Sequence, residues 1–129
     1  MSRIMVVDDE PMIVDLYSQM LAVNGHEVVA TAENGLQAVE NVEAMVTPPD
    51  LILMDHRMPK KNGLDATREI VRSRPGTKVL MVTADENVLA EVEGGGACGF
   101  LEKPFSFEKL EETIELVLAG GHPQVRVIP

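Results

Sequence analysis

Five side chains able to bind cations or anions are spread along this 129-residue chain, each at or just after the end of a short apolar run: Asp8, Asp9, Asp55, Thr83 and Lys103. Clustered carboxylates repel one another, so a shared site either raises a carboxyl pKa or holds a cation. A few carboxylate oxygens suit Mg²⁺ that retains several waters. A hydroxyl and an ammonium nearby would balance a second anion, and a phosphoryl group accepted by one carboxylate is the natural candidate.

The apolar runs that must position these side chains are too short for helices and are typical of buried strands. We expect strands at residues 4–7, 28–32, 51–54, 78–83 and 99–103. Helices are expected between and after them. The first begins at Pro11 and stops at Asn24-Gly25, and the last has Ser106 as its N-cap and ends at Gly120-Gly121. The fourth is expected to be short or frayed, because the glycines of residues 94–96 lower helix propensity.

Apolar residues at three- and four-residue spacing predict which helix faces turn toward the core. In the first helix these are Ile13, Leu16, Tyr17, Met20 and Leu21. In the second they are Leu36, Val39, Val42 and Val46, before Pro48-Pro49; in the third they are Leu64, Thr67, Ile70 and Val71, before Pro75-Gly76. In the last they are Phe107, Leu110, Ile114, Val117 and Leu118.

Strands that alternate with helices through five units predict an α/β fold, a parallel sheet with right-handed crossovers and helices on both faces. Such sheets bind ligands beyond the carboxyl ends of their strands, beside the point where the strand order reverses. The five reactive side chains are expected at that edge. A pair such as Asp8-Asp9 would by itself usually cap a helix, but together with Asp55 and Lys103 at strand ends it favours a metal site.

Composition narrows the classes of function. The length and the 45% hydrophobic content predict one domain with one core, at residues 1–120, followed by a short tail at 121–129. A net charge of −10 argues against nucleic-acid and anionic-membrane partners. The lone Cys98 and the lack of a long apolar N-terminal run favour a cytosolic protein. His26, His56 and His122 lack metal-ligand spacing and are expected at the surface.

The motifs that carry these residues resemble the receiver domains of two-component response regulators, over residues 3 to about 119. They are Val7-Asp8-Asp9-Glu10, Leu53-Met54-Asp55 with Met58-Pro59 and Gly63, Thr83-Ala84, and Gly99-Phe100-Leu101-Glu102-Lys103-Pro104-Phe105. The resemblance implies the flavodoxin-like strand order 2-1-3-4-5. It also implies a signalling domain that takes a phosphoryl group from a sensor histidine kinase or a phosphotransfer protein.

The resemblance assigns a role to each matching residue. Asp55 is the phosphoacceptor; Asp9, Asp55 and the backbone carbonyl of Arg57 bind Mg²⁺, with Mn²⁺ as a substitute, and Asp8 assists through water. Thr83 and Lys103 hold phosphoryl oxygens. Phe100 is an aromatic switch coupled to Thr83, although an apolar ring is most often core packing. The Lys103–Pro104 peptide bond is expected to be cis.

Two other classes of function are weighed against a switch. A Mg²⁺-dependent phosphohydrolase of the haloacid-dehalogenase type would need a second Asp two positions after the nucleophile, where this chain has Arg57. A pseudo-receiver that serves only as a docking surface would not need Asp9, Asp55, Thr83 and Lys103 together. The switch therefore remains the leading hypothesis, and its output is expected to pass through contacts with a downstream protein.

Charge is unevenly distributed along the chain. Residues 85–115 contain nine acids against Lys103 and Lys109, whereas residues 57–78 contain seven bases against two acids. The acidic segment predicts a monomer and a basic partner. Arg57 and Asp85, two residues after Asp55 and Thr83, are expected to meet at the mouth of the site. They either form an ordinary exposed ion pair or hinder water that would attack the phosphoryl group.

Overall fold

The computed structural model describes residues 2–88 and 95–120. A parallel sheet of five strands forms its centre, in the order β2-β1-β3-β4-β5. The strands are β1 (Arg3–Val7), β2 (Glu27–Ala32), β3 (Leu51–Met54), β4 (Lys78–Thr83) and β5 (Gly99–Glu102). The fold class and strand order expected from the sequence are confirmed. Register pairs Val7 with Met54 and Met54 with Met81, so β1 and β3 end level and β4 continues two residues further along the same edge, to Thr83.

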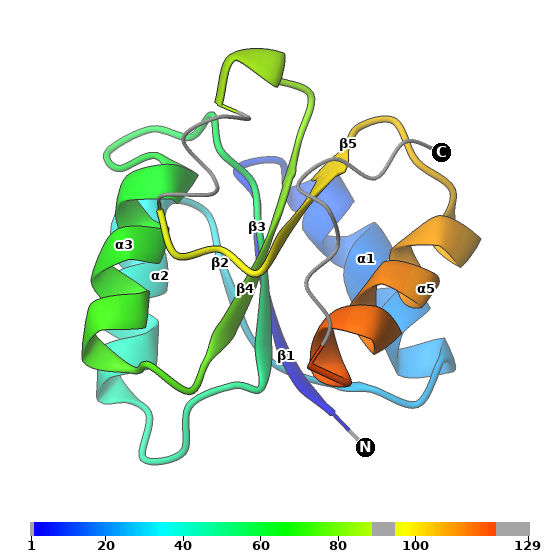
Figure 1. Cartoon of the computed structure of the whole chain (residues 1–129), viewed down its shortest axis with the longest axis horizontal. Coiled ribbons are helices and arrows are strands. Elements are labelled where there is room, and N and C mark those ends of the chain that lie inside the picture. The colour runs from blue at the N-terminus through cyan, green and yellow to red at the C-terminus, as the bar shows by residue number, and fades with distance from the viewer. Residues whose placement is uncertain (1, 89–94, 121–129) are drawn as a thin grey trace.

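In the part of the chain that the structure describes, four α-helices cover the two faces of the sheet (Figure 1). They are α1 (Pro11–Val23), α2 (Gly35–Ala44), α3 (Gly63–Ser73) and α5 (Phe107–Leu118), with a short 3₁₀ helix, η1 (Glu86–Val88), after β4. Helices α2 and α3 lie on one face, and α1 and α5 lie on the other. The predicted fourth helix survives in the described residues only as η1. Its continuation at 89–94 and the predicted tail at 121–129 lie outside them.

The sheet is buried on both faces, which is why its strands read as continuous apolar runs. Residues 51–54 of β3 are all fully buried, as are Val79, Leu80 and Met81 of β4. One apolar cluster lies under α2 and α3 and contains Phe100; the other lies under α1 and α5. Ser106 caps α5 as predicted, its hydroxyl accepting from the Lys109 N–H.

Several side chains expected in the core are exposed instead. Helix α2 ends at Ala44, so Val46 falls beyond it and is 97% exposed, and Leu36 is 40% exposed. The extended backbone of Met45, shortly before Pro48-Pro49, ends the helix before it can carry Val46 inward. Leu16 on α1 and Phe107 on α5 are 43% and 36% exposed.

Candidate functional site

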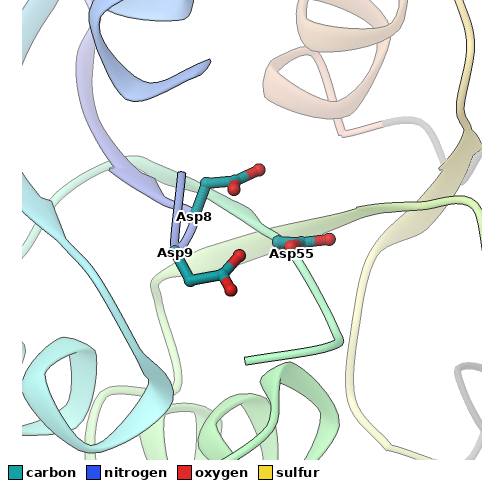
Figure 2. Close-up of side chains that lie close together, drawn as sticks. All are labelled: Asp8, Asp9 and Asp55. Atoms are coloured by element: carbon teal, nitrogen blue, oxygen red, sulfur yellow. The ribbon is translucent and has the colours of Figure 1, made fainter. Parts of the chain in front are cut away.

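Three carboxylates meet at the C-terminal edge of the sheet (Figure 2). Asp8 and Asp9 follow β1, and Asp55 follows β3; one carboxylate oxygen of each lies within 4.8 Å of the others. Backbone hydrogen bonds fix the two strand ends, since the Asp55 N–H donates to Val7 and the Asp8 N–H donates to Ala32. Asp8 and Asp55 are buried and Asp9 is exposed. This hard oxygen set fits a divalent cation that enters from solvent on the Asp9 side.

Lys103 places a positive charge beside the cluster. Its Nζ lies 3.1 Å from Asp8 Oδ2 and 3.6 Å from Asp55 Oδ1. Burial by itself lowers the pKa of Lys103, but the carboxylates of Asp55 and Asp8 outweigh burial and leave the pKa raised. The ammonium therefore stays charged, where it can receive an anion. The Lys103–Pro104 peptide bond is cis.

The acidity of the Asp55 carboxyl group is altered by its surroundings. Its burial raises the pKa to about 6, and the nearby charges of Asp8 and Asp9 act in the same direction. The Lys103 ammonium and a hydrogen bond from the His56 backbone partly oppose the rise. A carboxylate that is hard to ionise beside two other carboxylates gains from a cation that neutralises the cluster.

Thr83 and Asp85 form the opposite wall of the site. The buried Thr83 hydroxyl accepts from the Asp85 N–H at 3.2 Å. The Asp85 carboxylate accepts from the Asn87 N–H and forms an ion pair with Arg57, at 2.9 Å between Oδ2 and Nη2. The Arg57 side chain is 76% exposed, whereas that of Asp85 is 8% exposed. The pair expected from the sequence is therefore present, and it has one buried and one exposed partner.

These groups line one open cleft with a volume of about 690 Å³. Asp9, Asp55, Arg57, Thr83, Asp85 and Lys103 all contribute to its lining. Asp8 does not line the cleft, but its carboxylate accepts a hydrogen bond from the Lys103 ammonium, which does. Phe100, the proposed switch, is fully buried and packs in the cluster under α2 and α3 rather than lining the cleft.

Two neighbours of the site carried no role in the sequence analysis. A Cβ at Gly63 would lie 1.9 Å from the Asp55 carbonyl oxygen, so α3 can approach the Asp55 backbone only because this residue is glycine. Tyr17 was expected only as a core residue. Burial raises its pKa, and the nearby charges of Lys103, Asp8 and Asp55 also affect this pKa. The motif that contains Gly63 is the sequence signal for this close approach, whereas helical spacing could not place Tyr17 near a strand end.

The expectation that the histidines lie at the surface is wrong for His26, and His122 lies outside the described residues. His26 does not lie free at the surface: its side chain is 9% exposed, and its Nε2 contacts Glu111 of α5 at 2.9 Å. The turn after α1 carries His26 under α5, a long-range contact that local sequence does not reveal. Cys98 is half-buried against the cluster under α1 and α5. In the described residues, no helix has the length and apolar character needed to cross a membrane.

Comparisons with known proteins agree with this geometry. DegU of Brevibacillus brevis, a transcriptional regulatory protein, is 39% identical over 129 residues, covering 95% of this chain and 54% of DegU. The chemotaxis protein CheY of Bacillus subtilis is 36% identical over 118 residues, covering 90% of this chain and 97% of CheY. The chain thus spans about half the length of DegU and of other regulators that it matches.

Solved structures show the same fold. A CheY-like receiver domain protein from Methanospirillum hungatei superposes with a TM-score of 0.86 at 28% identity, covering 93% of this chain and 95% of that one. The Thermotoga maritima response regulator TrrA, solved with Mg²⁺ and BeF, has a TM-score of 0.80 at 33% identity, with coverage of 89% and 97%. A family model for the response regulator receiver domain matches residues 4–115. The chain therefore belongs to the receiver domains of two-component response regulators.

Proposed function

We propose that Asp55 accepts a phosphoryl group from the phosphohistidine of a sensor histidine kinase or a phosphotransfer protein. The P–N bond of the donor breaks, its electron pair returns to the imidazole, and a P–O bond forms to a carboxylate oxygen of Asp55. The observation that carries this assignment is the position of Asp55 within 3.6 Å of the Lys103 ammonium and inside a three-carboxylate cluster. The domain's chemistry is then limited to its own phosphorylation and dephosphorylation.

Mg²⁺ is the proposed cofactor, and Mn²⁺ suits the same oxygen donors. Asp9, Asp55 and the Arg57 carbonyl would bind the cation directly, and Asp8, which already contacts Lys103, would assist through water. The bound cation supplies charge neutralisation, without which three carboxylates would repel a phosphoryl dianion. The Mg²⁺ and BeF in the TrrA structure support this proposal by likeness.

Thr83 and Lys103 are proposed to hold the phosphoryl oxygens and to start the conformational switch. To bond the phosphoryl group, the Thr83 hydroxyl would donate its own proton, and a movement toward Asp55 would lengthen the hydrogen bond that its oxygen accepts from the Asp85 N–H. Phe100 is already enclosed in the core, so we place the coupled change in a shift of the ring within that cluster. Amide shifts of β4 and β5 that stay unchanged with beryllofluoride and Mg²⁺ would contradict the coupling.

The domain is proposed to act in the cytosol, as a monomer, through contacts with a downstream protein. The net charge of −10 opposes direct contact with nucleic acid or an anionic membrane. Whether a longer regulator contains this domain does not alter the chemistry at Asp55.

Incubation with acetyl phosphate and Mg²⁺, followed by intact-mass measurement, tests the proposed reaction. We expect one phosphoryl group per chain, stable in acid and labile in base, and none when Mg²⁺ is chelated. Asp55→Asn should abolish labelling, whereas Asp15→Asn, an exposed change on α1, should label like the wild type. Labelling of the Asp55→Asn variant at the wild-type rate would overturn the assignment. Sustained turnover would instead indicate a phosphohydrolase, and no reaction a docking module.

A further inference from the structure

Tyr17 is a buried aromatic residue on the helix that follows Asp8 and Asp9. It is the one tyrosine of a chain that has no tryptophan, and it is 6% exposed. It lies about 9 Å along the axis of α1 from Pro11, where the helix begins at the edge of the sheet that carries the site. Long side chains in a helix lean back toward its N-terminus. The phenol of Tyr17 therefore extends toward the site.

Tyr17 packs against the segment that carries Lys103. The two residues line one hollow of about 350 Å³, together with Pro104 and Phe105. The rings of Tyr17 and Phe105 contact each other, with their centroids 6.0 Å apart and their planes inclined at 34°. This separation is typical of a favourable contact between aromatic rings. Because Phe105 follows Lys103 by two positions, the ring contact holds the backbone of Lys103 against α1.

The charges around Tyr17 indicate that its hydroxyl end lies beside the site. Burial raises the pKa of Tyr17, and the Lys103 ammonium opposes that rise. The carboxylates of Asp8 and Asp55 add to the rise. The same two carboxylates flank the Lys103 ammonium. Tyr17 thus shares its electrostatic surroundings with Lys103, in agreement with the hollow that both side chains line.

Lys103 has a long side chain whose tip must stay in one place to hold a phosphoryl oxygen. Its Nζ donates to Asp8 Oδ2 at 3.1 Å and lies 3.6 Å from Asp55 Oδ1. These contacts hold the ammonium, whereas the four-carbon stem can change rotamer unless it packs against a surface. We propose that Tyr17 is a positioning residue, whose ring supports the stem of Lys103 and keeps the ammonium beside the carboxylates. This inference rests on the role in phosphorylation proposed above for Lys103.

Quenching of tyrosine fluorescence by acrylamide tests the contact between the ring and the stem. The emission reports Tyr17 alone, because the chain has no other tyrosine and no tryptophan. The measurement needs neither phosphoryl donor nor Mg²⁺, so it is independent of the reaction proposed for Asp55. Lys103→Ala should uncover the ring and raise the quenching constant about twofold, whereas Lys109→Ala on α5 should leave it unchanged. Equal quenching of the Lys103→Ala variant and the wild type would overturn the inference.

Labelling by acetyl phosphate and Mg²⁺ then tests the effect on the reaction. Tyr17→Leu removes the ring and should slow labelling about fivefold or more, whereas Tyr17→Phe keeps the ring and should stay within about twofold of the wild type. The matched control is Leu21→Val, a change further along α1 in the same apolar cluster, which should also stay within about twofold. Equal slowing of the Tyr17→Leu and Leu21→Val variants, or of both Tyr17 variants, would contradict support by the ring.

A double variant separates positioning of Lys103 from an ordinary role of Tyr17 in the core. If the ring acts through the Lys103 stem, Tyr17→Leu should change labelling by less than about twofold when Lys103→Ala is already present. A core role would instead slow the Lys103→Ala variant by the same factor as the wild type, and that result would overturn the inference. Failure of the proposed function is recognised separately, as absence of labelling in the wild type, and would remove the inference with it.

Discussion

At the scale of single residues, the three neighbouring carboxyl groups of the site differ in their exposure to solvent. Asp8 is buried and contacts Lys103, Asp9 is exposed, and Asp55 is buried with its pKa raised to about 6. Ionised Asp55 is therefore a destabilising group in the metal-free fold at neutral pH. This electrostatic cost is the reason that we expect a cation to bind beside Asp55.

Asp55→Asn should stabilise the metal-free domain in a pH-dependent way. The folded pKa of Asp55 lies above its unfolded value, so the stability linked to its proton is fully present below about pH 4 and is lost as pH rises through about 6. Asparagine has no carboxyl proton to lose, so its side chain stays neutral at every pH in this range. At pH 8 the variant should exceed the wild type by about 1–2 kcal/mol in free energy of unfolding, with little difference at pH 4. Chemical denaturation at both pH values measures this, and a pH-independent difference would contradict it.

The ion pair between Arg57 and Asp85 should act on the lifetime of the phosphorylated state rather than on stability. A pair with one exposed partner contributes only about 0–1 kcal/mol to folding. We expect the pair, at the mouth of the cleft, to restrict the approach of water to Asp55, and a change of about 1.4 kcal/mol in the barrier to hydrolysis is tenfold in rate.

Arg57→Ala and Asp85→Ala should each speed loss of phosphate from Asp55, and the double variant should be no faster than the quicker single variant. The rate is followed by intact mass after removal of acetyl phosphate. Arg72→Ala, an exposed change on α3, serves as the control. Additive effects of the two changes, or wild-type rates, would leave Arg57 as a solvated side chain.

At the scale of elements, the loop from β3 to α3 is held by backbone contacts that need glycine. The Gly63 N–H donates to the His56 carbonyl at 2.9 Å, directly behind Asp55. Gly35, at the start of α2, donates from its N–H to the Lys61 carbonyl, and a Cβ there would lie 2.4 Å from the same oxygen. Helices α2 and α3 thus hold the segment that follows the proposed phosphoacceptor.

Gly63→Ala should displace Asp55 and impair both folding and phosphorylation, because the new Cβ would overlap the Asp55 carbonyl oxygen. We expect a loss of about 1–3 kcal/mol in free energy of unfolding and slower labelling by acetyl phosphate. Gly76→Ala is the matched control: no atom lies within 4 Å of its added Cβ, so stability should change by less than about 0.5 kcal/mol. Equal stability and labelling in the two variants would show that the close approach at Gly63 does not position Asp55.

At the scale of the whole molecule, charge is separated between the basic segment 57–78 and the acidic segment 85–115. Lys103 is engaged by Asp8 and Asp55, which leaves Lys109 as the base of the acidic segment outside the site. Pairing of two copies through α5, which carries Glu108, Glu111, Glu112 and Glu115, would oppose like charges. Light scattering at moderate salt should therefore give the mass of a monomer, and a tight dimer burying α5 would overturn this prediction.

The sequence alone determined the strands and the edge at which their reactive residues meet. Apolar runs at 51–54 and 78–83 can only be buried on both faces, and parallel strands place Asp8, Asp55 and Thr83 at a common edge whatever the packing of the helices. The meeting of Arg57 with Asp85 follows from the same geometry. The sequence determines these features because each depends only on which residue lies at the end of a strand.

Only the tertiary structure decided which helix faces are covered. Spacing shows that Leu16 and Phe107 share a face with core residues, but burial depends on whether a neighbouring element lies over them, and α1 and α5 leave a groove there. The contact of His26 with Glu111 could not be predicted for the same reason, because it depends on how α5 packs beside the turn after α1. The two residues are 85 positions apart in the sequence. Helical periodicity records the direction of a side chain about its own axis, whereas exposure and long-range contacts depend on the packing of separate elements.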